Sequence, residues 1–503
     1  MDRLRHSPTL IERAANHGRR VAIVASEGTF SYDQLREASH RVASALLGAA
    51  QCADLAQARV AFLAPPGWHY VVSQWGIWRA GGIAVPLAVS HPPAELDYTI
   101  GDSQAAVVLA HPELADRVAG IAPARGVRLV LTSEALEAAP RSLPVLDPSR
   151  AAIIFYTSGT TGKPKGAVLT HANLQAQVES LVTAWEWAAD DRILGVLPLH
   201  HVHGVVNVLT CALWSGATCE LQPRFDAAEV WDRIATGRLT LFMAVPTIYA
   251  RLIAAWDDAP TAAQAAMSTS CRAMRLMVSG SAALPVSVLQ RWREISGHTL
   301  LERYGMTEIG MALANPLRGE RVPGSVGTPL PGVEVRLVDE VGRPVAAAGD
   351  PGEIEVRGPG VFREYWNRPA ETGAAFRDGW FRTGDVAAVE NGRYRILGRL
   401  SVDIIKTGGY KVSALEIEEV LREHPDVAEC AVVGVPDDEW GERVCAAVVQ
   451  REARAASPES LRDFVRDRLA PYKVPSRVIV VGELPRNAMG KVTKAEVVRL
   501  LAP

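Results

Sequence analysis

The sequence lacks long apolar runs, closely spaced cysteines and a strong net charge, and each absence excludes a class of protein. Its apolar runs are short and interrupted, so none supplies the roughly 18 residues of a membrane-spanning helix. Its 6 cysteines are widely spread with no CxxC pair, which argues against a zinc site or a disulfide framework. A formal net charge of -3 favours neither nucleic acid nor a membrane surface as a partner. We therefore expect a cytoplasmic protein whose binding sites are built from locally placed charges.

The first stretch, MDRLRHSPTLIERAANHGRR, also lacks the apolar segment of a secretory signal. Its several arginines leave a transit peptide open as an alternative, although the acidic residues among them argue against it. We therefore predict a cytoplasmic location.

The chain does contain a regular alternation of short β-branched runs and amphipathic helical stretches, from about residue 59 to residue 305. Runs such as RVAFLAP, AAIIFYTS and LTLFMAVP predict strands, whereas DAAEVWDRIA and PTIYARLIAAW predict helices. This alternation is typical of layered α/β domains with largely parallel sheets. Around 323–400, Gly/Pro turns between alternating strands predict a compact antiparallel subdomain.

After GRLS the chain restarts with a small α+β pattern of its own. Because 503 residues are too many for one core, we place a domain boundary near 399–402. The predicted fold class is α/β, with a large N-terminal domain over 1–399 and a small α+β C-terminal domain over 402–503. The large domain is expected to contain layered α/β subdomains and a small β-rich subdomain.

The loop YTSGTTGKPKG, from Tyr156 to Gly166, follows the buried run AAIIF and combines glycines with hydroxyls and two lysines. Its spacing differs from the Walker A pattern, and Pro164 would deny a helix its usual continuation after the lysine. Glycines still let successive backbone N–H groups turn toward an anion, and Ser and Thr hydroxyls add donors. The loop alone favours a phosphate-binding role, with a surface linker as the alternative.

This loop resembles the signature loop of the adenylate-forming superfamily, which includes acyl-CoA synthetases, peptide-synthetase adenylation domains and luciferases. Further segments match the family in order along nearly the whole chain: RYGMTE (303–308), GWFRTGD (379–385), YRILGR (394–399), KTGGYKVSALEIE (406–418) and PRNAMGKVTK (485–494). The segments LPLHHVHGVVNVL and SVDIIKTGGYKVSALEIE are especially similar to malonyl-CoA and methylmalonyl-CoA synthetases.

The resemblance implies an ATP-dependent carboxylate–CoA ligase. A carboxylate is a poor electrophile, so such an enzyme first attaches AMP to it with loss of pyrophosphate, and a thiol then attacks the acyl-AMP. The reaction needs ATP, Mg²⁺ and coenzyme A, with donors around the phosphates and a cation at the reacting oxygens. The expected acid is malonate, with methylmalonate as a further substrate.

The resemblance also implies roles for residues of the nucleotide site. Thr307 would meet the α-phosphate, and Glu308 would bind Mg²⁺ together with Thr160. Asp385 would accept hydrogen bonds from the ribose hydroxyls, and Arg399 would donate to them.

Adenine would lie on the small residues of SGSAAL (279–284), with Tyr304 stacked on its other face. The residues expected to contact the nucleotide or coenzyme A are Thr157, Ser158, Gly159, Thr160, Thr161, Gly162, Lys163, Lys165, Gly280, Ser281, Ala282, Arg303, Tyr304, Gly305, Met306, Asp385, Arg399, Gly408 and Gly409.

Lys491 resembles the family lysine that reaches the carboxylate and α-phosphate oxygens in the first half-reaction, with little role in thioester formation. In the family, the C-terminal domain swings about a hinge two residues after the arginine. That residue is Ser401 here, where the family has Asp or Lys, so we expect the hinge within 400–402. In the thioester state Gly408 and Gly409 would leave room for the pantetheine arm. Lys491 also resembles lysines that are acetylated in acyl-CoA synthetases, and acetylation would remove its charge.

The acyl pocket is expected to be built from LPLHHVHG, VPTIYARL and the SGS segment. Within it, Ser279 and Met306 are candidate substrate contacts. His201 matches the residue that gates the carboxylate in the family, with an ordinary core histidine as the alternative. Asp226 lies in the wrong place to anchor an amino group, so we interpret it as a helix cap.

A second carboxylate on the substrate needs a cation at the far end of this pocket. Arg251 lies on the first turns of the helix predicted for PTIYARLIAAW, and the resemblance favours a buried guanidinium that holds the carboxylate bidentately. A solvated helix arginine is the alternative. Arg291 and Arg293 are rival cations, although their helix is expected to face solvent.

Two other functions stay open within the same superfamily. In a medium-chain fatty acyl-CoA synthetase, Arg251 would point to water and the pocket would be an apolar tunnel. A stand-alone loading domain would pass the acyl group to a carrier protein instead of coenzyme A. A non-catalytic binding protein is difficult to reconcile with Lys491, Glu308, Asp385 and Arg399 all being present.

Overall fold

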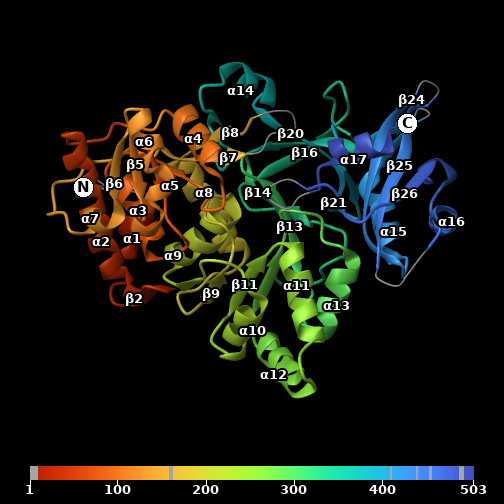
Figure 1. Cartoon of the computed structure of the whole chain (residues 1–503), viewed down its shortest axis with the longest axis horizontal. Helices are drawn as coiled ribbons and strands as arrows, with labels where there is room; N and C mark the ends of the chain where they lie inside the picture. The colour runs from red at the N-terminus through yellow and green to blue at the C-terminus, as the bar shows by residue number, and fades with distance from the viewer. Residues whose placement is uncertain are drawn as a thin grey trace.

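The computed structural model describes residues 9–157, 163–345, 347–407, 410–437, 440–451, 456–486 and 492–502. Within these residues the strands form four sheets, and the two largest, with helices packed around them, belong to the N-terminal part of the chain (Figure 1). This arrangement confirms the predicted α/β class, with a large N-terminal part and a smaller C-terminal part.

The first large sheet is mainly parallel and has nine strands. In spatial order they are β15 (Thr328–Pro329), β14 (Gly310–Ala314), β13 (Leu301–Met306), β12 (Leu276–Ser279), β11 (Leu241–Ala244), β9 (Arg192–Gly195), β10 (Thr218–Leu221), β1 (Val21–Ala25) and β2 (Gly28–Ser31). The six strands from β13 to β1 run parallel, and their Val, Leu, Ile and Met side chains are almost entirely buried. Such apolar runs are expected where helices cover both faces of a parallel sheet.

The second large sheet has seven strands, and its edge brings together segments far apart in sequence. Their spatial order is β18 (Glu364–Tyr365), β8 (Lys165–Thr170), β7 (Ala151–Thr157), β4 (Ile83–Pro86), β3 (Arg59–Leu63), β5 (Val107–Ala110) and β6 (Arg128–Leu131). Strand β18 pairs with β8 so that Tyr365 lies opposite Ala167. This pairing places Tyr365 beside the end of the glycine-rich loop.

The helices around these sheets follow the predicted alternation. They are α1 (Thr9–Ala14), α2 (Tyr32–Ala50), α3 (Trp68–Arg79), α4 (Pro93–Asp102), η1 (Pro112–Leu114), α5 (Asp116–Ala119), α6 (Ile121–Ala124), α7 (Thr132–Leu136), α8 (His171–Ala184), η2 (His203–Thr210), α9 (Cys211–Ser215), α10 (Ala227–Ala235), α11 (Pro246–Asp257), α12 (Thr261–Arg272), α13 (Val286–Ser296) and α14 (Pro369–Ala375). Asp226 caps α10 by accepting a hydrogen bond from the Glu229 N–H at 3.0 Å, which confirms its predicted role.

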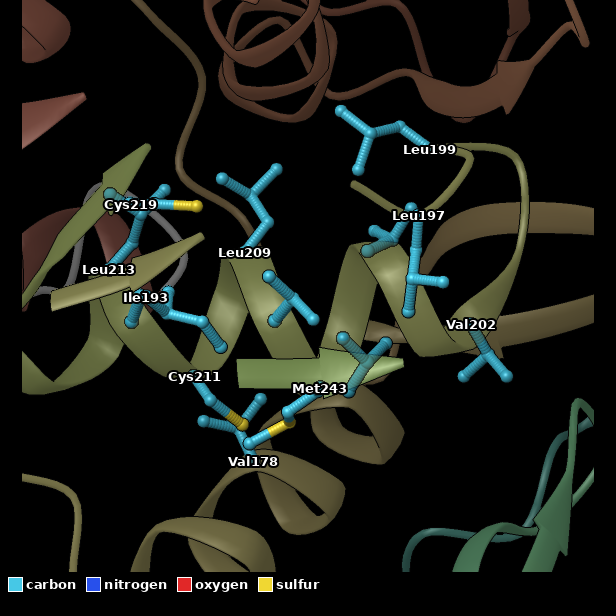
Figure 2. Close-up of a cluster of buried hydrophobic side chains, with 14 of the residues drawn as sticks. Val178, Ile193, Leu197, Leu199, Val202, Leu209, Cys211, Leu213, Cys219 and Met243 are labelled. Carbon is cyan, nitrogen blue, oxygen red and sulfur yellow. The ribbon is translucent and has the colours of Figure 1, made fainter. Parts of the chain in front are cut away.

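Helix η2 is a π-helix, wider than an α-helix, and it begins at the end of the segment LPLHHVHG, which was predicted to line the acyl pocket. The Thr210 hydroxyl and the Cys211 N–H both bond to carbonyls five residues back, at Val205 and Val206. Figure 2 shows Leu209 and Cys211 pointing into a core shared with strands β9, β10 and β11. This packing leaves His203, at the start of η2, buried at the carboxyl edge of the parallel sheet. Local π-helical turns are rare and often occur at functional sites.

A separate antiparallel sheet follows, as predicted for 323–400. Its strands are β16 (Glu334–Val338), β17 (Gly352–Arg357), β19 (Phe376–Arg377), β20 (Trp380–Glu390) and β21 (Arg393–Arg399). Strand β21 leads directly into the C-terminal part of the chain.

The C-terminal part has its own sheet and its own core (blue in Figure 1). Its elements are β22 (Ile404–Thr407), β23 (Tyr410–Ser413), α15 (Ala414–Glu423), β24 (Val427–Asp437), β25 (Gly441–Gln450), α16 (Pro458–Arg466), η3 (Pro471–Lys473), β26 (Arg477–Val480) and α17 (Lys494–Leu501). The buried clusters of this part contain only residues from Ile405 onward. The domain boundary near 399–402 stays a prediction.

The six cysteines are free thiols, and five of them are buried. No helix among the described residues combines the length and the hydropathy that crossing a membrane requires.

Glu302, on β13, has a buried carboxyl group that accepts one hydrogen bond. The Leu284 N–H donates to its Oε1 at 3.3 Å, and its Oε2 has no hydrogen-bond partner among the described residues. Burial raises the pKa of Glu302 to about 8. The carboxyl group is therefore mainly protonated in the folded protein at neutral pH.

We predict that Glu302 makes the free energy of unfolding fall as the pH rises from about 4.5 to about 8. Over this range the folded state holds a proton that the unfolded chain has released. Glu302→Gln has no such proton, so it should gain roughly 3 kcal/mol over wild type at pH 7 and little at pH 4. Urea unfolding at several pH values measures this gain. The exposed Glu179→Gln should keep the wild-type slope, and an unchanged slope in Glu302→Gln would contradict the prediction.

Candidate active site

The site begins where β13 extends beyond its neighbour β12. Ser279, the last residue of β12, lies opposite Glu302, so Arg303 to Met306 continue past the end of the parallel strand. Ligands of open parallel sheets bind outside the carboxyl ends of the strands, which is where this extension lies. The predicted residues Arg303, Tyr304, Gly305 and Met306 therefore share one edge with the Ser279–Ser281 segment.

Asp385 joins this edge to the antiparallel sheet. It lies opposite Arg399 across β20 and β21, and Arg399 donates from Nε to Asp385 Oδ1 at 2.8 Å and from Nη2 to Oδ2 at 3.3 Å. The Tyr304 hydroxyl donates to Asp385 Oδ2 at 2.7 Å. Three residues that the sequence analysis placed around the nucleoside thus form one hydrogen-bonded group.

Tyr304 and Arg399 both stay protonated near neutral pH. Burial raises the pKa of the Tyr304 hydroxyl well above its usual range, and the neighbouring Asp385 carboxylate raises it further. The hydroxyl therefore stays a donor. Burial alone would lower the pKa of Arg399, but its hydrogen bonds and ion pair with Asp385 outweigh burial and raise it. The group can present a carboxylate and a guanidinium to a vicinal diol, which keeps ribose binding as its predicted role.

Glu308 lies in the turn between β13 and β14, beside Thr307. Its side chain is buried, and the Tyr365 hydroxyl donates to its Oε1 at 2.8 Å. Burial raises the pKa of Glu308, whereas the hydrogen bond from Tyr365 lowers it. The turn depends on Gly310, whose φ is +63°. A Cβ atom at this position would overlap the Gln177 side chain.

The glycine-rich loop connects β7 and β8, which pair antiparallel with Thr157 opposite Lys165. The Tyr98 hydroxyl donates to the Pro164 carbonyl at 2.7 Å, and Lys163 lies over the Tyr98 ring at 5.4 Å. These contacts hold the end of the loop that leads into β8.

Tyr365 connects the loop to the buried carboxylate. Lys165 Nζ lies 5.4 Å from the centre of the Tyr365 ring, while the hydroxyl of the same ring bonds Glu308. Lys165 also forms an ion pair with Glu371 on α14. A lysine of the loop and the predicted metal ligand are therefore both within reach of one side chain.

A buried polar wall lies on the other side of β13. The Arg303 guanidinium, only 2% exposed, donates from Nη2 to Ser281 Oγ at 3.2 Å. Ser281 has a left-handed backbone with φ +69°, and its Oγ lies 3.2 Å from His203 Nδ1. Because Ser281 accepts from Arg303, its hydroxyl proton can go to Nδ1, which leaves the ring proton of His203 on Nε2. Gly280 lets the guanidinium lie close to the backbone, since a Cβ there would be 2.7 Å from Arg303 Cζ.

Several polar atoms of this wall have no hydrogen-bond partner among the described residues. They are Arg303 Nε and Nη1, His203 Nε2, Ser279 Oγ and both amide atoms of Asn207. Burial lowers the pKa of Arg303 to about 9, so the guanidinium keeps its charge at neutral pH. Burial also lowers the pKa of His203 well below its usual range, and nearby Arg303 lowers it further, so the imidazole is neutral. Unpaired buried polar groups are costly, so these atoms are candidates for contact with a polar ligand.

Arg251 does not have the buried position that the sequence analysis expected. It lies on α11 with an exposed side chain, because Ile248, Tyr249 and Leu252 form the buried face of that helix. It has no ion pair or hydrogen bond to another described side chain. The helical spacing could not distinguish the two faces at this position. The buried guanidinium in this region is that of Arg303, beside Ser281, and Arg303 was predicted as a nucleotide contact.

His201, the predicted gate, is half-buried and lies against His200 with ring centroids 4.1 Å apart. Burial, together with the nearby His201 and His91, lowers the pKa of His200 to about 2. Of the rival cations, Arg291 forms ion pairs with Asp257 and Glu294 on the surface, as expected for a solvent-facing helix.

The remaining predicted site residues lie outside the described part of the chain: Ser158, Gly159, Thr160, Thr161, Gly162, Gly408, Gly409 and Lys491. Tyr365 and Tyr98 contact the site from other segments and were not predicted from the sequence. His203 was predicted only as part of the pocket segment. A histidine directly before a glycine in a mainly apolar segment is the sequence signal that could single it out.

Comparison with protein families matches residues 10–366 to the AMP-binding enzyme family and residues 416–491 to the AMP-binding enzyme C-terminal domain. A mitochondrial malonate–CoA ligase from Mus musculus is 49% identical over 98% of this chain and 90% of its own length. A malonate–CoA ligase from Arabidopsis thaliana is 41% identical over 97% of this chain and 87% of its own length.

Among solved structures, ATP-bound MatB from Rhodopseudomonas palustris has a similar fold. Its TM-score is 0.89 and its sequence identity 35%, over 98% of this chain and 99% of that one. The similarity extends over both the N-terminal and the C-terminal part of the chain.

We predict that Asp385→Ala weakens ATP binding by about 10- to 100-fold, because charge-assisted hydrogen bonds at this carboxylate contribute roughly 1.5–3 kcal/mol. Titration calorimetry with ATP and a fixed Mg²⁺ concentration measures the change. Glu390→Ala is a matched control, since Glu390 lies on the same strand and forms only an exposed ion pair with Arg395. Equal affinity of wild type and Asp385→Ala for ATP would refute the assigned role.

Proposed function

The chain belongs to the AMP-binding enzyme family, and we propose that it is an ATP-dependent malonate–CoA ligase. In the first step an oxygen of one malonate carboxylate bonds to the α-phosphorus of ATP, and pyrophosphate leaves. In the second step the sulfur of coenzyme A bonds to the carbonyl carbon of malonyl-AMP, and AMP leaves. ATP and coenzyme A are consumed as substrates, and the products are malonyl-CoA, AMP and pyrophosphate.

Glu308 suits the Mg²⁺ that such a reaction requires. Its buried carboxylate has one oxygen bonded to Tyr365, and hard cations prefer oxygen ligands. Among the described residues no group of three or more His, Cys, Asp or Glu side chains could hold a metal ion by itself. This is consistent with a cation shared between one carboxylate and the phosphates of ATP, with Thr160 as a further proposed ligand. Bound Mg²⁺ would neutralise charge on the phosphates as pyrophosphate leaves.

The other nucleotide contacts follow from the same assignment. Asp385 and Arg399 would orient the ribose, and Thr307 would donate to the α-phosphate. Lys165 would exchange Glu371 for a phosphate oxygen, since both sit at the surface, where such ion pairs are weak. The residues of the loop outside the described part, together with Thr157 and Lys163, would surround the β- and γ-phosphates.

The relatives named malonate–CoA ligases support the choice of malonate, and the observation in this chain that fits it is Arg303, a buried cation with donor atoms that have no partner among the described residues. A guanidinium matches a carboxylate in a bidentate arrangement, and Nε with one Nη is a suitable pair of donors. The hydroxyl of Ser279, the amide of Asn207 and the Nε2–H of His203 offer further donors. A monocarboxylic acid would leave all of these groups unpaired. Malonate, which carries a second carboxylate, would pair them.

Arg251 is proposed as a second cation for the same carboxylate. It lies one and a half turns into α11, and α11 follows β11, whose end is level with Ser279. It therefore lies at the same edge of the sheet as the polar wall, on the solvent side. Met306 and His201 are the proposed remaining contacts of the acyl group.

We further propose that residues 402–503 form a mobile domain that swings at 400–402, with Ser401 as hinge. In the adenylation state Lys491 would reach the carboxylate and the α-phosphate. In the thioester state Gly408 and Gly409 would border the pantetheine arm of coenzyme A. Acetylation of Lys491 would remove its charge and stop the first step. Mass spectrometry of active and inactive fractions tests this, and unmodified Lys491 in the inactive pool would count against it.

The proposed location is the cytoplasm. The relatives from Mus musculus and Homo sapiens are named mitochondrial, so a mitochondrial location is the competing proposal. Cell fractionation of the expressed full chain separates the two.

Two related functions compete with malonate activation. A medium-chain fatty acyl-CoA synthetase would prefer octanoate, and a carrier-loading domain would transfer malonate only to a carrier protein. Thioester formation from free coenzyme A, with malonate, octanoate and acetate compared, distinguishes all three.

We predict that Arg303→Met lowers kcat/KM for malonate by at least about 30-fold, because losing one desolvated, charge-assisted pair costs roughly 2–5 kcal/mol. Activity with acetate should change little, since acetate has no second carboxylate. Arg251→Met should have the same selectivity with a smaller effect, because its side chain is exposed and screened.

The exposed Arg293→Met on α13 is the control and should behave as wild type. Circular dichroism verifies that Arg303→Met is folded. If octanoate is the better substrate and Arg303→Met leaves malonate activity unchanged, the family membership stands and the malonate proposal fails.

A further inference from the structure

Lys494 is a buried cation that the proposed mechanism does not use. It is the first residue of α17, and its side chain is only 12% exposed. Its Nζ lies 2.6 Å from Asp403 Oδ1 and 2.9 Å from Glu418 Oε1. The Arg422 guanidinium balances the second carboxylate by donating to Glu418 Oε2 at 2.9 Å.

Asp403 connects this ion cluster to the chain segment proposed as the hinge. Its Oδ2 accepts a hydrogen bond from the Arg399 N–H at 3.0 Å, and its own N–H donates to the Arg399 carbonyl at 2.7 Å. Both bonds close the turn that contains Ser401. The turn also requires Gly398, with φ +129°, because a Cβ there would lie 2.4 Å from Asp403 Cβ. One carboxylate therefore binds Lys494 and the turn at the end of β21.

Lys494 also follows directly after the loop that carries Lys491. The base of this loop is closed by a bridge between Arg486 and Val492 and by a hydrogen bond from the Thr493 N–H to the Pro485 carbonyl at 2.8 Å. Lys494 is the next residue, so its ion pairs fix one end of the loop base. Lys491 is only three residues earlier in sequence.

A buried ion cluster is a poor way to gain stability. Removing three charges from water costs several kcal/mol for each ion, and apolar residues of the same volume are often as stable or better. Ion pairs do, however, require defined geometry, which suits a group that must hold one segment relative to another. Here the cluster joins the hinge turn, α15 and the base of the Lys491 loop.

We propose that Lys494 is a positioning residue for the first half-reaction: through Asp403 it holds the base of the loop, at Arg486 and Val492, at a fixed place relative to the hinge turn. This inference rests on the proposed function, since it requires Lys491 to act in malonyl-AMP formation and not in thioester formation. Lys494 itself touches no substrate. Its loss therefore slows adenylation and leaves the second half-reaction intact.

The test measures the two half-reactions separately in the full-length enzyme. Malonate-dependent exchange of pyrophosphate into ATP reports the first, and coenzyme A acylation by chemically prepared malonyl-AMP reports the second. We expect Lys494→Met to lower the exchange rate by at least about 30-fold, as small misplacements of a catalytic group do. Acylation should stay within about threefold of wild type, because it does not use Lys491.

The matched control is Lys473→Met. Lys473 also forms an ion pair with α15, through both oxygens of Glu416 at 2.7 and 2.8 Å, but it is remote in sequence from the loop. Lys473→Met should not slow one half-reaction more than the other. Lys494→Arg, which keeps the charge, should recover most of the exchange rate lost in Lys494→Met. If Lys494→Met does not fold, Asp403→Asn, which nearly preserves volume, replaces it in the test. Asp403→Asn should show the same selective loss of the exchange reaction.

Equal loss of both half-reactions in the folded variants would show that the cluster is merely structural and would overturn the inference. Unchanged exchange in Lys494→Met would overturn it as well. The proposed function fails separately, when wild type itself exchanges no pyrophosphate with malonate. The same pair of assays would then be run with the acid that wild type activates, so the role of Lys494 is still decided.

Discussion

The carboxylate of Asp385 is the interaction on which the arrangement of the site depends. It binds Tyr304 from the nine-stranded sheet and Arg399 from the end of the antiparallel sheet. The two sheets share one hydrophobic core, and this carboxylate adds a buried polar connection between them directly before the chain enters its C-terminal part. A group that orients the nucleotide at this point would also define where the C-terminal part begins. In the proposed function, one side chain would therefore contribute both to nucleotide binding and to the position of the C-terminal part.

Much of this arrangement could be predicted from sequence because the signals are local. Strands such as β11 and β12 are short apolar runs bounded by turns, and the cap at Asp226 is read from three residues. The family motifs contributed Glu308 and Asp385 as candidates, since their spacing along the chain is characteristic. None of these inferences requires knowledge of which segments lie side by side.

The contacts that were missed are those that only tertiary structure creates. Tyr365 reaches Glu308 because β18 pairs with β8, across nearly 200 residues of sequence. Whether Arg251 and Arg303 are buried or exposed also could not be predicted from the sequence alone. Helical spacing did not determine whether Arg251 lies on the buried or the exposed face of α11. The burial of Arg303 follows from the extension of β13 past β12. Periodicity assigns a residue to an element, but the packing of that element decides what the residue meets.

The buried charges of the protein fall into two kinds, and the difference separates function from support. Asp191 accepts hydrogen bonds from Arg275, Thr240 and the Ala188 N–H, so both of its oxygens are paired. Such a closed network fixes the end of one strand against its neighbours. Arg303 is equally buried, yet two of its donor atoms have no partner among the described residues. A ligand carboxylate at these donor atoms would pair them, which is the role proposed for malonate.

The charges around Lys494 form ion pairs with one another, and the position of this cluster suits a further role. Its members come from the hinge turn, from α15 and from the start of α17, which are the segments that a swinging domain must keep in register. Ser401 carries no charge, so the hinge residue cannot itself form the ion pairs that Asp or Lys would allow. Asp403, two residues later, supplies a charged anchor on the C-terminal side of the turn. Its bond to the Arg399 N–H crosses the proposed pivot, whereas its bond to Lys494 lies wholly beyond it. A rotation at Ser401 would strain the first contact and preserve the second, so the loop base would move with the domain as one unit.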